Sequence, residues 1–335
     1  MRAVSEPISL RSRPYAAGDL QPSPPLGARR QPARLGLHLA LLLATFLTAA
    51  LAYAVHSGAD VFADPLELGV GVPYAVALIA ILLAHELGHY TLARWHRVEA
   101  TLPFFIPAPP LFFIGTLGAF IRMRTLPRDR RALFDVGAAG PWAGIAVAVP
   151  VLMLGLALSE VRPMEGVEPG WYLGEPLLFK ALSWAVLGTS GDEATIVLHP
   201  IAMAGWVGLL VTALNLMPVG QLDGGHIVYA WVGERWHRWV SAGCLTSLLV
   251  LSIGGAPSWI VWAALLFALG IRHPRLADNH TPLDRRRGVA AAASLVLFVL
   301  TFMPEPLHFV PPPLPRDPSA IPVAAPPPPD WSIPL

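Results

Sequence analysis

The stretch that decides the fold is GVPYAVALIAILLAHELGHYTLARW, residues 71–95. It is mostly apolar and long enough for a helix to cross the hydrocarbon core of a bilayer, which takes about 20 residues. His85, Glu86 and His89 interrupt the apolar run. Ionisable side chains are costly inside a membrane and usually have a function there. The stretch therefore predicts a membrane span that carries a chemical site.

The composition of the whole chain also indicates a membrane protein. Of the 335 residues 54% are hydrophobic and 13% are charged, whereas a soluble domain is roughly 45–50% apolar and about 25% charged. The net charge is only +1, so no overall field favours nucleic acid as a partner. A single cysteine, Cys244, excludes an internal disulfide and a cysteine-rich metal site.

Further apolar runs are candidate membrane spans. Together they predict an all-α multi-pass membrane protein with about six to seven transmembrane helices. The candidates are residues 35–55, 71–95, 133–158, 194–217, 240–254, 259–271 and 288–303. The fifth and sixth runs are short, and one helical hairpin or partly interfacial helices would explain them equally well.

The two ends of the chain differ from the apolar region between them. Residues 1–34 are rich in Pro and Arg and lack a periodic apolar pattern, which predicts a disordered arm. Residues 304–335 are rich in Pro and predict a disordered tail. Residues 35–303 are expected to form one integral membrane domain, since no long polar segment divides the spans.

Arginine accumulates in alternate loops, as the positive-inside rule expects of cytoplasmic segments. The arm and the loop between the second and third spans are rich in Arg, whereas the loop between the third and fourth spans is acidic. The N-terminus is therefore predicted to be cytoplasmic, and an odd number of spans places the tail outside. A multi-pass chain without a transit-like leader suits a bacterial cytoplasmic membrane.

The pattern HExxH at residues 85–89 predicts a metal site. Residues four apart lie on one face of a helix, so His85 and His89 can converge on one ion while Glu86 points about 100° away. Two neutral imidazoles suit Zn²⁺, and the carboxylate can accept a proton from a water whose pKa the metal lowers to about 7. A catalytic zinc normally takes three protein ligands, so another donor is required.

The best candidate for the third ligand is Asp223, in the stretch NLMPVGQLDGGH at residues 215–226. Pro218 and the glycines of this stretch break a helix, and irregular backbone at membrane depth survives where it is buried in protein or lines a cavity. The predicted spans 71–95 and 194–217 run in the same direction and so end at the same depth. A solvated aspartate in a cytoplasmic turn is the alternative.

The two motifs together resemble the paired signature of the site-2 protease family, peptidase family M50. In that signature HELGH in a span is followed by Asn-x-x-Pro-x-x-x-Leu-Asp-Gly, as in this chain. The resemblance implies that His85, His89 and Asp223 bind one Zn²⁺ per chain and that Glu86 is the catalytic base. It further implies that Asn215 holds the substrate backbone or the oxyanion. Neither terminal region is covered by the resemblance.

Two other stretches fit the resemblance. Residues 137–144, GAAGPWAG, give a smooth helix face that another helix can approach closely. This agrees with the three-helix catalytic core that the family implies, although simple helix packing explains it as well. Residues 102–121 are apolar but rich in Pro and Gly and have Arg on both sides, which predicts a re-entrant segment. The family implies a β-loop here whose edge strand pairs with an unwound substrate; an interfacial loop is the alternative.

The predicted function is that of an intramembrane zinc endopeptidase in regulated intramembrane proteolysis. Its expected partners are the lipid bilayer and single-pass membrane proteins, cut in or near their transmembrane segment. A peptide bond inside a helix is shielded, so the substrate must be unwound or already shortened by another protease.

Two other functions remain open. A membrane metal transporter or sensor could use the same cluster, but it explains neither the carboxylate beside His85 nor the Asn-x-x-Pro before Asp223, and paired repeats are not visible. A different membrane zinc peptidase, such as one that trims prenylated proteins, is the second. Such enzymes resemble HExxH enzymes whose third ligand is a Glu on a later helix, whereas Leu-Asp-Gly in this chain favours Asp223. His226 follows the third-ligand motif. We expect it to support the ligands from outside the metal site or to have a purely local role, because a fourth protein ligand would close the site.

Overall fold

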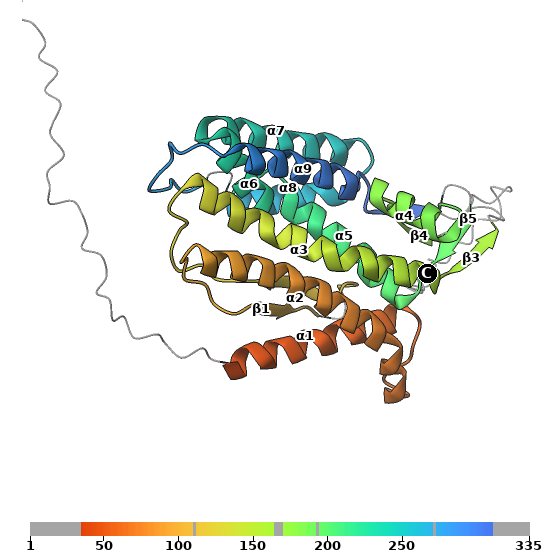
Figure 1. Cartoon of the computed structure of the whole chain (residues 1–335). Coiled ribbons are helices and arrows are strands. Elements are labelled where there is room, and N and C mark those ends of the chain that lie inside the picture. The colour runs from red at the N-terminus through yellow and green to blue at the C-terminus, as the bar shows by residue number, and fades with distance from the viewer. Residues whose placement is uncertain (1–34, 110–111, 164–169, 192–193, 271–272, 311–335) are drawn as a thin grey trace, which may run out of the picture. The chain divides into compact units, whose positions relative to one another are not determined.

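The computed structural model describes residues 35–109, 112–163, 170–191, 194–270 and 273–310. The predicted arm, residues 1–34, lies outside the described residues, as does most of the predicted tail, residues 311–335. The described part of the chain is mostly helical (Figure 1).

Within the described ranges, three segments are long and apolar enough to cross a membrane. They are α1 (Leu35–His56), α2 (Val72–Trp95) with the 3-10 helix η1 (Pro65–Gly71) before it, and α3 (Arg130–Ala157). Asp129 precedes α3 and accepts a hydrogen bond from the Ala132 amide at 2.9 Å, which satisfies one of the free amides at the helix start. These segments support a membrane protein.

Six further helices, each shorter than α1, follow in the described part of the chain. They are α4 (Leu177–Leu187), α5 (Pro200–Leu216), α6 (Asp223–Val232), α7 (Glu234–Ile253), α8 (Ser258–Leu269) and α9 (Arg285–Thr301). Helices α5, α7, α8 and α9 fall on the last four predicted spans, but they do not meet both the length and the apolarity of a span. The predicted number of six to seven spans therefore stays a prediction.

The mostly helical fold also contains, among the described residues, six short strands that form three antiparallel pairs. They are β1 (Phe104–Pro107) with β2 (Thr116–Phe120), β3 (Glu160–Pro163) with β5 (Ala194–Val197), and β4 (Gly170–Leu173) with β6 (Leu307–Val310).

Two predicted boundaries were wrong for this reason. The span predicted from residue 194 begins as strand β5, and its helix starts only at Pro200, where the His199 side chain accepts a hydrogen bond from the Ile201 amide at 3.2 Å. A proline at the first helical position favours this start. The tail predicted to be disordered from residue 304 contains β6, whose backbone pairs with β4.

Helices α2, α3 and α5 pack against one another in pairs, as the predicted three-helix core requires (Figure 1). Small residues permit the close approach of α3 and α5. A Cβ on Gly155 would come within 2.1 Å of the Ala202 backbone nitrogen, and a Cβ on Gly205 within 2.7 Å of Leu152 Cα. Backbone packed this closely holds the helices at one depth relative to each other.

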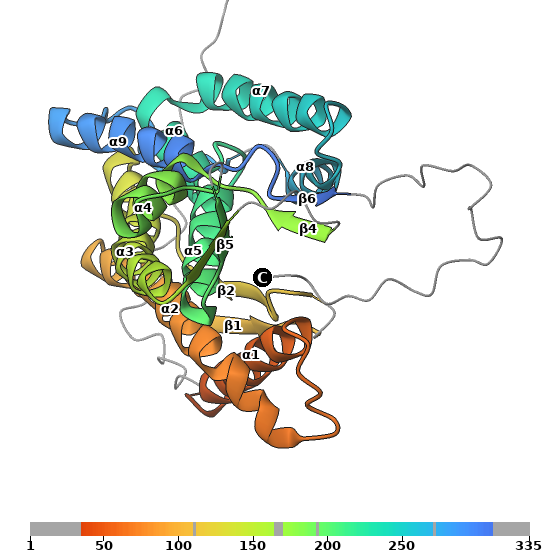
Figure 2. The same ribbon diagram turned by 90° about the vertical axis from the view of Figure 1, so that its right-hand side faces the viewer.

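The predicted re-entrant segment, residues 102–121, contains the β1–β2 pair. Figure 2 shows both strands next to α1. Side chains of the helices hold the connecting turn: Thr48 donates to the Gly115 carbonyl at 2.8 Å and Tyr74 to the Ile114 carbonyl at 3.0 Å. A β conformation for this segment agrees with the structure, whereas its passage into a membrane stays a prediction.

Candidate metal centre

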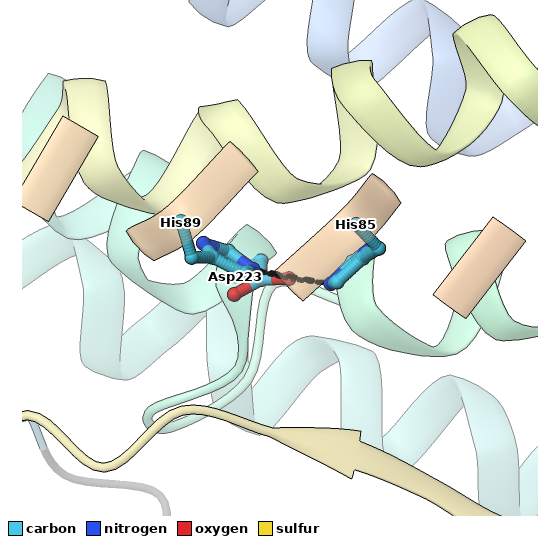
Figure 3. Close-up of side chains that lie close together, drawn as sticks. All are labelled: His85, His89 and Asp223. Carbon is cyan, nitrogen blue, oxygen red and sulfur yellow. Dashed lines mark hydrogen bonds and ion pairs between the residues drawn. The ribbon is translucent and has the colours of Figure 1, made fainter. Parts of the chain in front are cut away.

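Helix α2 presents His85 and His89 on one buried face. The two residues are one helical turn apart, and their side chains converge, with Nε2 atoms 3.1 Å apart (Figure 3). His85 is 4% exposed and His89 8%. Buried imidazoles need partners, since an unpaired polar group in a low-dielectric interior is costly.

Asp223 reaches the same point from the first residue of α6. Its Oδ2 lies 3.3 Å from His85 Nε2 and 3.2 Å from His89 Nε2. The chain turns between α5 and α6 at Gly220, whose φ of +55° lies in the left-handed region that favours glycine. Helix α6 then starts in close contact with the end of α5. Only glycine fits at position 224, since a Cβ there would be 1.9 Å from the Leu216 carbonyl oxygen.

The spacing of these donor atoms fits a tetrahedral ion. Ligands about 2.0–2.2 Å from such an ion lie about 3.3–3.6 Å from one another. The separations among the donor atoms of His85, His89 and Asp223 are 3.1–3.3 Å, at or slightly below the lower end of this range. In the described part of the chain these three residues form the group whose ligand atoms all lie within 4.8 Å of one another. The arrangement leaves a fourth position for a water molecule.

The hydrogen bond on the far side of His89 also favours a cation. Its Nδ1 lies 2.8 Å from the Val136 carbonyl oxygen, which can only accept, so Nδ1 carries the proton. In the neutral ring Nε2 is then a bare acceptor facing the Asp223 carboxylate. Two acceptors 3.2 Å apart repel each other unless a positive charge lies between them.

Glycines of α3 make room for both imidazoles. A Cβ on Gly140 would be 2.0 Å from His89 Nε2, and a Cβ on Gly144 would be 3.2 Å from the His85 ring. The small-residue stretch 137–144, predicted to serve helix packing, therefore also seats the metal-site side chains. Sequence reasoning missed this second role, although the glycine spacing was visible.

Glu86 lies beside the site on the same helix and is 5% exposed. The backbone of Ile121, just after β2, lies near its carboxylate. The end of the β1–β2 segment thus meets the predicted base.

Asn215 lies on the last turn of α5, and its Nδ2 is 3.3 Å from His85 Nε2. The structure therefore brings all five predicted site residues together, at one junction of α2, α5 and α6. His226 does not join the metal site; its Nδ1 contacts His273 instead.

Comparisons with known proteins cover this junction. The model of the family described as Peptidase family M50 matches residues 73–253, more than half of the chain. The chain belongs to peptidase family M50. The predicted family resemblance is confirmed, and the matched region of this M50 member contains every site residue named above.

Curated plant relatives agree with the family. The rice (Oryza sativa subsp. japonica) protein named "Probable zinc metalloprotease EGY1, chloroplastic" is 35% identical over 240 residues, which are 70% of this chain and 40% of the relative. The Arabidopsis thaliana EGY1 of the same name is 34% identical over 241 residues, 70% of this chain and 43% of the relative. The M50 chain thus spans less than half the length of these relatives.

Proposed function

We propose that this chain is a zinc metalloprotease in which His85, His89 and Asp223 hold the metal and Glu86 is the base. The observation that carries the proposal is the convergence of two buried histidines and the partly buried Asp223, with donor atoms 3.1–3.3 Å apart and the buried Glu86 carboxylate beside them. Membership of peptidase family M50 and the names of the EGY relatives support it.

The donor set suits zinc best among the common metals. Two imidazoles and one carboxylate in tetrahedral spacing match zinc hydrolase sites, whereas Mg²⁺ and Ca²⁺ prefer six or more oxygen ligands. When bound, zinc supplies a Lewis acid that activates water and polarises a carbonyl. One ion per chain is expected from one such group.

Glu86, His89 and Asn215 each have a separate role in the proposed reaction. The Glu86 carboxylate takes a proton from the attacking water and hands it to the leaving amine nitrogen. His89 keeps its Nε2 toward the centre, because Nδ1 donates to Val136. The Asn215 amide, 3.3 Å from His85 Nε2, is placed to donate a hydrogen bond to the substrate carbonyl.

The proposed substrates are single-pass membrane proteins cut in or near their transmembrane segment. Two observations support a substrate that arrives through the bilayer: the ligand pair lies on a helix long and apolar enough to span it, and the residue after β2 lies near Glu86. An extended peptide that adds to the β1–β2 pair would place its backbone next to the site. A helical substrate must unwind there or be shortened beforehand by another protease.

The proposed orientation places the metal end of the bundle in the cytoplasm. Exposed arginines gather where α2 ends and where α3, α7 and α9 begin: Arg94, Arg97, Arg122, Arg124, Arg128, Arg131, Arg235, Arg238, Arg285 and Arg286. The opposite end carries Asp60, Asp64, Glu67 and Glu160 against the two basic residues Arg162 and Lys180. This asymmetry follows the positive-inside rule. A cytoplasmic N-terminus, an outside tail and a bacterial membrane stay predictions; the named relatives are chloroplastic.

The test is cleavage in reconstituted vesicles. The purified chain, with one zinc per molecule, should cut a co-reconstituted single-pass protein, and a zinc chelator or Glu86→Gln should stop it. Proteins that co-purify with Glu86→Gln but not with wild type are the substrates to try first. Zinc flux across the vesicles without any cleavage would overturn the proposal in favour of the transporter alternative.

A further inference from the structure

A second pair of histidines contacts one another next to the metal centre. His226 lies on α6, one helical turn after Asp223, and His273 lies in the segment between α8 and α9. Nδ1 of His226 is 2.8 Å from Nε2 of His273. Neither ring takes part in the proposed reaction, so the pair needs another explanation.

The donor and the acceptor of this hydrogen bond can be assigned. His273 Nδ1 lies 2.6 Å from the Pro274 carbonyl oxygen, which can only accept, so Nδ1 carries the proton. Nε2 of the neutral His273 ring is then an acceptor, and His226 Nδ1 is the donor. Burial lowers the pKa of His226 to about 3 and also lowers that of His273, so both rings are neutral near pH 7.

His273 is itself held in place. The Tyr229 ring stacks on it with ring centroids 4.2 Å apart. The same segment is bound to α3 on either side of the helix start: the Asp278 amide donates to the Arg128 carbonyl at 2.9 Å, and Arg131 Nε donates to the Pro282 carbonyl at 3.0 Å. His273 is therefore a fixed point relative to α3, the helix that seats His85 and His89.

Helix α6 lies on α3 and carries Asp223. A Cβ on Gly137 would be 2.8 Å from His226 Cβ and 3.5 Å from the Asp223 carbonyl oxygen, so glycine permits this contact. At the other end of α6, the Arg130 guanidinium donates to the carbonyls of Ala230 and Trp231, both at 2.8 Å. Since α6 is a single helix of 10 residues, a rotation at His226 moves Asp223 as well.

We propose that His226 and His273 are positioning residues, whose hydrogen bond fixes the rotation of α6 and so aims the Asp223 carboxylate at His85 and His89. The proposal rests on the metal site proposed above. Metal ligands tolerate displacements of only about 0.2 Å, and loss of an outer partner of a ligand typically costs about 10–100-fold in metal affinity. Here the outer partner acts through the helix instead of through the ligand atom.

The test compares side chains that keep the hydrogen bond with side chains that lose it. His226→Asn retains an N–H donor near the position of Nδ1, whereas His226→Leu has none. In the same way His273→Gln retains an acceptor near the position of Nε2, whereas His273→Leu does not. Zinc affinity of the full chain in detergent is measured by competition with a chelator, and Co²⁺ in place of zinc reports the ligand geometry through its visible absorption.

The Leu variants should bind zinc about tenfold more weakly or worse and should show shifted Co²⁺ bands, while His226→Asn and His273→Gln should stay near wild type. Leu variants with wild-type affinity and spectrum would overturn the proposal. So would equal losses in the Asn and Leu variants, because packing alone would then explain them.

Folding and the metal site are tested separately. If a Leu variant does not fold, His226→Gln replaces it, because its amide donor lies one methylene further out and should lose the bond to His273. His85→Ala in the same assay should bind no zinc. Full zinc affinity in His85→Ala would refute the metal site itself, whatever the histidine pair does.

Discussion

Gly140 lies directly against His89, so that a Cβ at position 140 would come within 2.0 Å of the His89 Nε2 atom. Real Cβ atoms do not approach other atoms this closely, and the imidazole cannot retreat while its Nδ1 donates to Val136 at 2.8 Å. A single methyl group added at position 140 would therefore displace the His89 imidazole from the candidate metal site.

Gly140→Ala should therefore lose zinc and activity although no ligand is changed. Metal analysis of the purified variant checks this. Gly243→Ala is the matched control, because it lies within α7 with nothing near its Cβ position, and alanine in a helix interior is favoured over glycine by about 1 kcal/mol. A Gly140→Ala variant with full zinc content would show that the His89 side chain can shift without loss of the metal.

Glu86→Gln should keep zinc and the fold but lose cleavage by about 10²–10⁴-fold, because the amide preserves the shape and removes the base. Zinc content and the initial rate of cleavage are measured on the same preparation. Turnover at the wild-type rate would exclude Glu86 as the base.

His85→Ala and His89→Ala should each lose zinc together with activity, because two remaining protein ligands hold the ion poorly. The readout is the zinc content after dialysis against a weak chelator. Full occupancy in either variant would remove that histidine from the site.

Asp223→Asn should weaken zinc binding and abolish cleavage, since a neutral amide is a much poorer ligand for a cation than a carboxylate. Asp223→Glu should regain part of the zinc affinity but little activity, because the longer side chain displaces the ion. Chelator competition and cleavage assays separate the two effects. Wild-type zinc affinity in Asp223→Asn would point to another third ligand.

The stability of the fold should fall in mild acid because of His237. This ring is fully buried, its Nε2 donates to the Gly220 carbonyl at 3.2 Å, and Tyr229 and His273 pack around it. Burial, helped by the neighbouring His273, lowers the pKa of His237 to about 4. The stabilisation is therefore complete above the unfolded-state pKa of about 6.5 and is lost as the pH falls from there toward 4; at pH 5 the loss is about 2 kcal/mol.

His237→Gln keeps a donor for Gly220 but does not titrate. Thermal unfolding of both metal-free proteins at pH 8 and pH 5 should show a smaller drop for the variant. Identical drops would mean that His237 takes up no proton on unfolding.

Much of the site could be predicted from the sequence. Helix geometry alone places residues four apart on one face, so HExxH in an apolar run indicated the pair His85 and His89. The helix-breaking residues before Asp223 indicated a buried turn with one carboxylate. Glu86 followed from its place beside the first ligand. These inferences depend on local geometry, which few residues determine.

The fold was predicted less completely, because short strands depend on their partners. Residues 194–197 are apolar enough to continue the span that follows them, and residues 307–310 lie within a Pro-rich region typical of a disordered tail. Only pairing with β3 and β4, respectively, makes these two segments strands. A strand gains its hydrogen bonds from a distant segment, so its own residues do not determine it.

The sequence by itself determined the family, the membrane character and the candidate metal ligands, because these follow from composition, from the spacing of His85 and His89 along one helix and from the motif around Asp223. The tertiary structure decided which backbone supports each donor. The carbonyl that orients His89 is 47 residues away from it, and His273 is equally far from His226. Such contacts exist only after α3 has packed against α2 and α6, and no local rule of chain geometry specifies that packing.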